Sequence, residues 1–220
     1  MANALRYERK FQVDRLSLDF VLSVLRRHPA GFWPLFPDRT IHNIYFDTPE
    51  LVTHTYNLLG AGERRKFRVR WYGDTATEVV QPRLEIKRRL HLLGDKLSYP
   101  VPPWEWSSLR ALTHEVRSHV PDAPALLPQL YNRYRRSYLS TTDGRFRITI
   151  DRDLAYLPLA VVPATTLAIR LSGRLYPDAS IVVELKYAAA DDERVGEIMA
   201  HLPFRITKNS KYATGMLTVG

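Results

Sequence analysis

Much of the chain alternates hydrophobic and polar residues with a period of two, which is the pattern of β-strands with one face turned to a core. These segments are rich in β-branched and aromatic residues, which favour extended structure. They predict strands at 6–13, 40–47, 64–72, 82–91, 95–101, 131–139, 145–151, 167–172 and 180–187. A glycine and an aspartate stand together at 93–95 and at 142–144, and both segments are predicted to be tight hairpin turns. The pattern therefore predicts many antiparallel strands.

Three segments repeat hydrophobic residues at helical spacing and predict helices outside the sheet. Each follows a candidate capping residue, which is Ser17 for the first, Ser107 or Ser108 for the second, and Asp191 or Asp192 for the third. The stripes expected to pack on the core are Phe20, Val21, Val24 and Leu25, then Leu109, Leu112 and Val116, and then Val195, Ile198, Met199 and Leu202. The prediction is one α+β domain over residues 1–220, mostly antiparallel β.

Arginine and lysine dominate the polar faces of these strands. The faces carry Arg64, Lys66, Arg68 and Arg70, then Arg83, Glu85, Lys87 and Arg89, then Arg145, Arg147, Thr149 and Asp151, and in the first and last strands Glu8, Lys10, Glu184 and Lys186. For any single strand, a face exposed to solvent explains the pattern. Across five strands, however, so many like charges side by side lower stability unless an anion lies among them.

The charge balance agrees with an anionic ligand. The 32 basic and 23 acidic residues give a net charge of +9, which predicts nucleic acid, a phosphorylated small molecule or an acidic membrane surface as partner. If the charged faces point into a closed β-barrel, the lumen is basic, and the scattered glutamates suit a divalent metal such as Mg²⁺ or Mn²⁺. Cations around a carboxylate-held metal are the chemistry of a triphosphate or polyphosphate site.

Several other chemistries are disfavoured by what the sequence lacks. It has no cysteine, no P-loop, no GxGxxG or GxSxG motif, and no close cluster among its seven histidines. Nucleic-acid binding stays open on charge alone but is disfavoured, because carboxylates in the charged rows would repel backbone phosphates. The polar start of the chain and the absence of a long apolar segment favour a cytoplasmic protein.

Eight segments stand in a characteristic order along the chain: RYERKF (6–11), IYFDTPEL (44–51), KFRVRWYG (66–73), LEIKRR (84–89), YRRSYL (134–139), FRITIDRDL (146–154), VVELKY (182–187) and KNSKYATGM (208–216). In this order they resemble the VTC domain, the catalytic domain of vacuolar transporter chaperone polyphosphate polymerases. That domain is grouped with the triphosphate tunnel metalloenzymes, together with the CYTH phosphatases and class IV adenylate cyclases. The resemblance implies a closed β-barrel that forms a tunnel.

The resemblance also implies roles for individual positions. Those that match the phosphate-binding tunnel residues of the family are Lys10, Arg68, Arg70, Lys87, Arg136 and Arg147, with Lys208 and Lys211 near the end of the pattern. Glu184 matches the metal-binding glutamate of the family. Four further residues lie on the same predicted faces, two assigned to phosphate and two to the metal: Lys66 and Lys186, and Glu8 and Glu85.

The resulting hypothesis is a metal-dependent polyphosphate polymerase, using Mn²⁺ or Mg²⁺, that transfers the terminal phosphoryl group of ATP to phosphate, pyrophosphate or polyphosphate. A triphosphatase of the same fold and a non-catalytic polyphosphate-binding module remain as alternatives. Where CYTH enzymes begin with ExExK, this chain has Arg6, Glu8 and Lys10, which favours the VTC branch. The resemblance also implies a membrane-protein partner, which would bring the protein to the inner face of a membrane.

Overall fold

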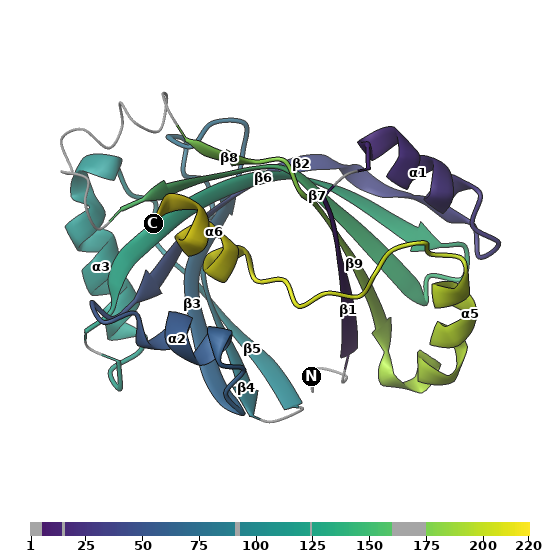
Figure 1. Ribbon diagram of the computed structural model, residues 1–220. Coiled ribbons are helices and arrows are strands. Elements are labelled where there is room, and N and C mark those ends of the chain that lie inside the picture. Colours follow the sequence, from purple (N-terminus) through teal and green to yellow (C-terminus); the bar gives the residue numbers. More distant parts are fainter. Residues whose placement is uncertain (1–5, 15, 91–92, 124, 160–174) are drawn as a thin grey trace. The chain divides into compact units, whose positions relative to one another are not determined.

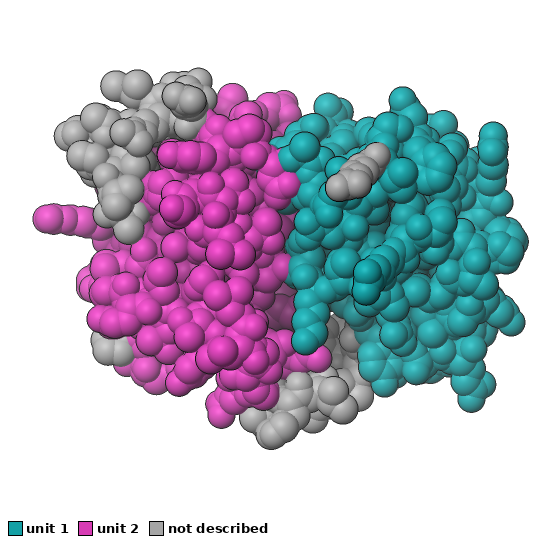
Figure 2. All heavy atoms as spheres, viewed as in Figure 1, with its two compact units in different colours: residues 1–39, 135–154, 179–209 teal, residues 40–134, 155–178, 210–220 magenta. Residues whose placement is uncertain are grey.

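The computed structural model describes residues 6–14, 16–90, 93–123, 125–159 and 175–220 (Figure 1). Contacts within the chain define two compact units, which Figure 2 shows in different colours. Unit 1 comprises 1–39, 135–154 and 179–209, and unit 2 comprises 40–134, 155–178 and 210–220. Each unit thus combines segments that are distant in sequence, and the single domain predicted from the sequence stays a prediction.

The strands of the described residues form one nine-stranded sheet. Hydrogen bonds join them in the order β1-β9-β7-β6-β2-β3-β4-β5, and β8 pairs with β7. Their bounds are β1 (Arg6–Val13), β2 (Phe32–Asp47), β3 (Glu63–Tyr72), β4 (Arg83–Leu90), β5 (Leu93–Pro100), β6 (Leu127–Thr141), β7 (Phe146–Pro158), β8 (Tyr176–Asp178) and β9 (Ile181–Ala188). The α+β class with an antiparallel sheet is confirmed, while closure of the sheet into a barrel stays a prediction.

Five α-helices and two 3₁₀ helices accompany the sheet in the described part of the chain (Figure 1). Their bounds are α1 (Leu18–Arg26), α2 (Val52–Leu58), α3 (Leu109–Ser118), α5 (Val195–Ala200) and α6 (Lys211–Val219), with η1 (Trp106–Ser108) and η2 (Ala189–Arg194). Among these described helices, none has the length and apolar character needed to cross a membrane.

Each unit has its own hydrophobic core. In unit 1, Phe11 of β1 packs in a buried cluster with Leu25 of α1 and Ile198 of α5. In unit 2, the ring of Trp71 lies at the centre of an aromatic cluster, with its centroid 5.2 Å from that of Trp104. Burial of such large apolar side chains supplies most of the driving force that holds the strands in register.

The alternating pattern located most of the strands correctly. The structure confirms eight of the nine predicted segments in outline, and the ninth, 167–172, lies outside the described residues. The turn predicted at 142–144 is confirmed, with Gly144 at a φ of 72° that favours glycine. The turn predicted at 93–95 is wrong, because Gly94 pairs with Arg89 and Asp95 with Arg88 inside the β4–β5 ladder.

The helix predictions were correct in place and partly wrong in detail. Ser17 caps α1 by accepting a hydrogen bond from the Phe20 backbone N–H at 3.2 Å, yet the Phe20 side chain is exposed. The cap predicted at Asp191 or Asp192 is wrong, because these residues lie within η2 and α5 begins only after Arg194. Helices α2 and α6 were not predicted.

Close packing fixes helix α6 in unit 2. A Cβ atom placed on Gly215 would lie 2.5 Å from Leu130 Cδ2 and 2.5 Å from Tyr156 Cδ1. Only a residue without a side chain therefore allows α6 to approach β6 and β7 so closely. By contrast, a Cβ on Gly196 in α5 would meet nothing within 4 Å.

This difference gives a matched pair of variants. We expect Gly215→Ala to lower the free energy of unfolding by about 1–3 kcal/mol, because the added methyl overpacks the helix contact. Gly196→Ala should instead raise it by about 0.5 kcal/mol, because alanine has less freedom in the unfolded chain. Urea denaturation measures both. Equal effects of the two substitutions would contradict the packing described for α6.

Candidate functional site

The polar face of β3, β4 and β5 is a ladder of cations in unit 2. The register places Lys66 opposite Lys87 and Lys87 opposite Lys96, so that three lysines stand in one row across three strands. The next rows along the strands pair Arg68 with Glu85 and Arg70 with Arg83. The structure thus brings together the four cations of β3 and β4 that the sequence analysis assigned to phosphate binding, which are Lys66, Arg68, Arg70 and Lys87, and it adds Lys96, which was not assigned.

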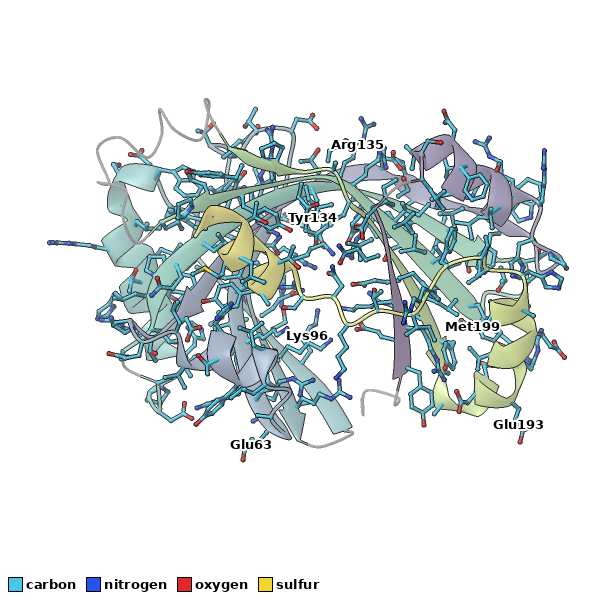
Figure 3. The ribbon with its side chains drawn as sticks, viewed as in Figure 1. Glu63, Lys96, Tyr134, Arg135, Glu193 and Met199 are labelled. Atoms are coloured by element: carbon cyan, nitrogen blue, oxygen red, sulfur yellow. The ribbon has the colours of Figure 1, made fainter. Side chains whose placement is uncertain are left out.

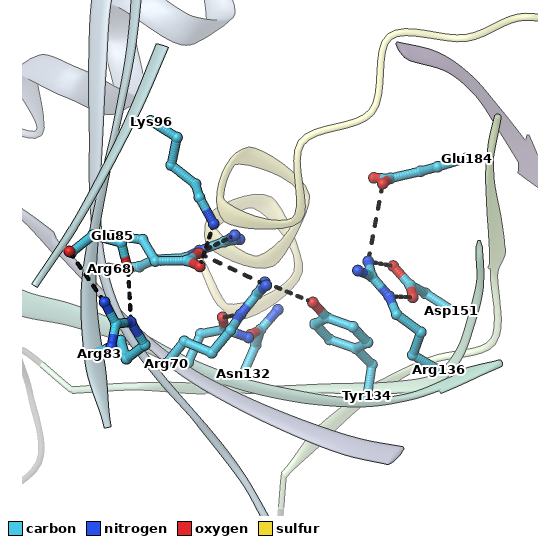
Figure 4. Close-up of polar contacts among 12 residues, drawn as sticks. Arg68, Arg70, Arg83, Glu85, Lys96, Asn132, Tyr134, Arg136, Asp151 and Glu184 are labelled. Carbon is cyan, nitrogen blue, oxygen red and sulfur yellow. Dashed lines mark hydrogen bonds and ion pairs between the residues drawn. The ribbon is translucent and has the colours of Figure 1, made fainter. Parts of the chain in front are cut away.

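Glu85 balances this face. Arg68 donates from Nε and Nη2 to Glu85 Oε2 at 2.8 and 2.6 Å, and Lys96 Nζ donates to Oε1 at 2.8 Å (Figure 4). Arg70 Nη1 lies 3.7 Å from the same carboxylate. Burial alone would raise the pKa of Glu85, but Arg68, Arg70 and Lys96 hold that pKa well below its usual range. Burial likewise opposes the charge of Arg68, and Glu85 more than offsets this, so the pKa of Arg68 is raised.

Neutral groups orient Arg70. Its Nε donates to Asn43 Oδ1 and its Nη2 to the Tyr134 hydroxyl, both at 2.9 Å, and Asn43 is itself held by Asn132. Tyr134 and its chain neighbour Arg135 point to opposite sides of β6, as alternation requires (Figure 3). The Arg70 side chain is buried, and hydrogen bonds to amide and hydroxyl oxygens fix the guanidinium without cancelling its charge.

The start of α6 brings a further cation into unit 2. Lys211 is buried with Nζ 4.8 Å from the centroid of the Tyr134 ring, which is cation–π geometry. The next residue, Tyr212, donates its hydroxyl to Asp47 at 2.8 Å. Asp47 also accepts hydrogen bonds from the Thr53 and His54 backbone N–H groups, both in α2. Asp47 therefore joins the end of β2 to α2 and α6 and positions Lys211.

In unit 1, Glu184 of β9 lies among three cations. Lys10 Nζ is 3.2 Å from Glu184 Oε1, and Lys186 Nζ is 3.0 Å from Oε2. Arg136 Nη2 is 3.9 Å from Oε2. Glu184 is buried, so each of these contacts is screened less than a surface ion pair would be.

Asp151 orients Arg136. The guanidinium donates from Nε at 2.5 Å and from Nη2 at 2.7 Å to the two carboxylate oxygens of Asp151, which is fully buried (Figure 4). This bidentate pair fixes the plane of the guanidinium. The sequence placed Asp151 on a polar face but gave it no role, because the partner lies on another strand.

The remaining predicted residues of both units are less enclosed. Arg147 is exposed on β7 and stands opposite Lys186 in the register. Lys208 is exposed next to Asn209, whose backbone carbonyl accepts a hydrogen bond from Lys10 Nζ at 3.3 Å. Lys66 in unit 2 donates to Ser210 Oγ at 2.9 Å. The sequence predicts that all these side chains line one lumen, and that stays a prediction.

Two carboxylates of unit 1 could hold a divalent metal. Among the described residues, no group of three or more His, Asp and Glu side chains is arranged for one. Glu8 Oε1 and Glu184 Oε2 nevertheless converge on one cationic atom, Lys186 Nζ, at 3.7 and 3.0 Å. Carboxylate oxygens are preferred ligands of Mg²⁺, which commonly completes its shell with water and substrate phosphate. This pair therefore fits a metal that is also bound by phosphate, while the metal role predicted for Glu85 in unit 2 stays a prediction.

Solved structures establish the class of fold. The chain is similar to a proposed adenylate cyclase from Vibrio parahaemolyticus, with a TM-score of 0.56 and 12% identity over 96% of this chain and 98% of that one. A proposed adenylyl cyclase from Hippeastrum, described as having a dominant triphosphatase activity, matches with a TM-score of 0.53 and 14% identity over 97% and 96% of the two chains. At these identities the likeness shows that the chain shares the fold of these proteins.

The family follows from the sequence itself. The model of the VTC domain matches residues 5–219, so the chain belongs to the VTC domain family. The family resemblance stated from eight sequence segments is therefore confirmed. Its members are phosphate-handling enzymes and are in general metal-dependent. No curated protein matches the sequence.

The contacts of Glu85 predict opposite effects on stability and on anion binding. We expect Glu85→Gln to lower the free energy of unfolding by about 2 kcal/mol, because it leaves Arg68 and Lys96 without a buried counter-charge. The same change should strengthen the binding of tripolyphosphate, because the anion no longer competes with an internal carboxylate. Urea denaturation and isothermal titration calorimetry measure the two effects.

Glu63→Gln is the matched control, because Glu63 is an exposed residue of β3. It should change neither quantity appreciably. Because the pKa of Glu85 is depressed, its stabilising contribution is present above the ordinary pKa of a glutamate, about 4.3, and is lost as the pH falls below it. Wild type should therefore lose more stability than Glu85→Gln on acidification. Weaker anion binding by Glu85→Gln would contradict the counter-charge role.

Proposed function

We propose that this protein is a polyphosphate polymerase that transfers the terminal phosphoryl group of ATP to phosphate, pyrophosphate or a polyphosphate chain. The observation that supports this most is the ladder on β3, β4 and β5, where cations repeat in rows along the strands. A repeating row of cations suits a ligand that itself repeats a negative charge. Membership of the VTC domain family supports the same assignment.

The reaction proposed is a direct displacement. An oxygen of the acceptor phosphate attacks the γ-phosphorus of ATP, the bond from that phosphorus to the β–γ bridging oxygen breaks, and ADP leaves with that electron pair. The acceptor grows by one phosphate, and no covalent intermediate with the protein is formed. Such transfers depend mainly on alignment and on neutralising charge, so they require well-held cations more than a nucleophile.

The side chains divide this work by their chemistry. Arginines can bind phosphate oxygens through two N–H groups at once, which favours Arg68, Arg70 and Arg136 as orienting groups. Lysines act as point charges, a role for Lys87, Lys96 and Lys211. Mn²⁺ or Mg²⁺, when bound by Glu8 and Glu184, would supply further charge neutralisation on phosphate oxygens.

The second candidate is a triphosphatase, in which water replaces the acceptor phosphate. The Hippeastrum protein described above, which shares the fold, is described as having a dominant triphosphatase activity. The same cations would serve both reactions, so the geometry of phosphate binding favours neither. The third candidate is a module that binds polyphosphate through the same cations without turnover.

Product analysis separates these functions. We expect purified protein incubated with ATP and Mn²⁺ to form a polyphosphate ladder and ADP with little free phosphate, and to form it faster when pyrophosphate is added as acceptor. Gel electrophoresis with polyphosphate staining and quantification of ADP and phosphate measure this. Free phosphate without polymer would instead establish the triphosphatase, and tight binding of polyphosphate with neither product would establish the binding module.

A substitution of Arg70 tests whether the cations on the polar face of β3 and β4 bind phosphate. We expect Arg70→Ala to weaken tripolyphosphate binding about 10- to 100-fold, since a hydrogen bond to a charged group contributes about 1.5–3 kcal/mol. The control is Arg88→Ala, which removes the same charge from the opposite face of β4, where Arg88 is exposed and pairs with Asp95. Equal affinities of the two variants in calorimetry would contradict the assignment.

A further inference from the structure

Positive and negative side chains alternate along and across β1 and β9 of unit 1. The register places Lys10 opposite Glu184 and Glu8 opposite Lys186. Opposite charges directly across an antiparallel pair stabilise the ladder. Lys186 makes contacts both along its own strand and across to the neighbouring strand, because its Nζ lies 3.0 Å from Glu184 Oε2 and 3.7 Å from Glu8 Oε1. One ammonium group is therefore shared by two carboxylates.

We propose that Lys186 is a tethered cation that occupies the Glu8–Glu184 pair in the free protein and competes there with a divalent metal. Metal then binds strongly only when a phosphate group draws the ammonium away. This inference rests on the proposed function for the presence of a metal and a phosphate. It adds that Lys186 makes the binding of the metal depend on the binding of phosphate.

Glu8 and Glu184 meet at Lys186 Nζ, so a metal bound by both carboxylates would take nearly the same place. Two positive charges this close together repel strongly at the effective dielectric constant typical of protein surfaces, as Coulomb's law gives. The metal and the ammonium are therefore alternatives for the same pair.

The surroundings of Lys186 determine what can release it. On the side of β7, its register partner is Arg147, another cation, which repels the ammonium. Glu184 Oε1 is already bound by Lys10 at 3.2 Å. A phosphate oxygen arriving at this face offers Lys186 a new anionic partner and leaves Glu8 Oε1 and Glu184 Oε2, the two atoms that Lys186 contacts, to the metal.

Linkage makes this dependence reciprocal. If phosphate raises the affinity for the metal by some factor, the metal raises the affinity for phosphate by the same factor. Lys186 would thus prevent the carboxylate pair from binding metal unproductively when no substrate is present. It is a positioning residue for the metal, acting through Glu8 and Glu184.

The test measures Mn²⁺ binding alone, without nucleotide, by the electron paramagnetic resonance signal of free Mn²⁺. We expect Lys186→Met to bind Mn²⁺ at least about tenfold more tightly than wild type, because the competing charge is gone. The double variant Lys186→Met with Glu8→Gln should lose this gain, because its site has only one of the two carboxylates. Arg145→Met removes one positive charge from an exposed side chain of unit 1 and should leave the affinity unchanged.

A second titration adds inorganic phosphate, with chloride of equal ionic strength as the reference. Phosphate should raise the Mn²⁺ affinity of wild type several-fold and that of Lys186→Met much less, because that variant has no ammonium to displace. Thermal unfolding checks that each variant is folded, and Lys186→Gln replaces the methionine variant if that one is not.

Equal Mn²⁺ affinity of wild type and the lysine variants would overturn the inference, and so would a gain that does not require Glu8. These titrations involve no turnover. A protein that shows the metal–phosphate coupling but makes no polyphosphate would therefore contradict the proposed polymerase and leave the role of Lys186 standing. Polymer formation without metal–phosphate coupling would contradict the role of Lys186 and leave the proposed polymerase standing.

Discussion

Cations crowd together on the polar faces of this sheet, and their mutual repulsion determines where its buried carboxylates lie. Lysines and arginines stand in register on neighbouring strands, as in the row of Lys66, Lys87 and Lys96. Such neighbours destabilise a sheet unless something balances them. The protein answers with a few buried carboxylates, which neutralise part of the charge and leave the remainder for a ligand.

The two units provide this balance in similar ways. Glu85 in unit 2 and Glu184 in unit 1 each lie among three cations, and in each case two of the contacts are 3.2 Å or shorter. Arg70 and Arg136 show two further ways in which a cation is held in place. Arg70 donates to an amide oxygen and a hydroxyl oxygen, so more of its positive charge remains available to an anion. Arg136 instead pairs with the carboxylate of Asp151, which neutralises much of its charge. Cations of one residue type therefore differ in how strongly they attract an anion.

The sequence predicted the parts of this arrangement that local pattern determines. Alternation with a period of two identified the strands and showed that Arg68, Arg70 and Lys87 share polar faces. It could not identify Asn43 or Tyr134 as partners of Arg70, because they lie 27 and 64 residues away and only the sheet order brings them together. Lys96 lies within the predicted strand 95–101 but was given no role, because it is the single cation of that segment and its place opposite Lys87 follows only from the strand pairing.

Helix α6 was also not predicted from the sequence. Its packing has a consequence for natural variation. Tyr212 and Gly215 fix this helix through a buried hydroxyl and an absent side chain, neither of which carries charge at neutral pH. Homologues compared only by their basic residues would look equivalent when position 215 differs, although Lys211 one turn earlier would stand elsewhere. In this chain, the position of Lys211 therefore depends on the space left by an uncharged residue as well as on the helix that carries the lysine.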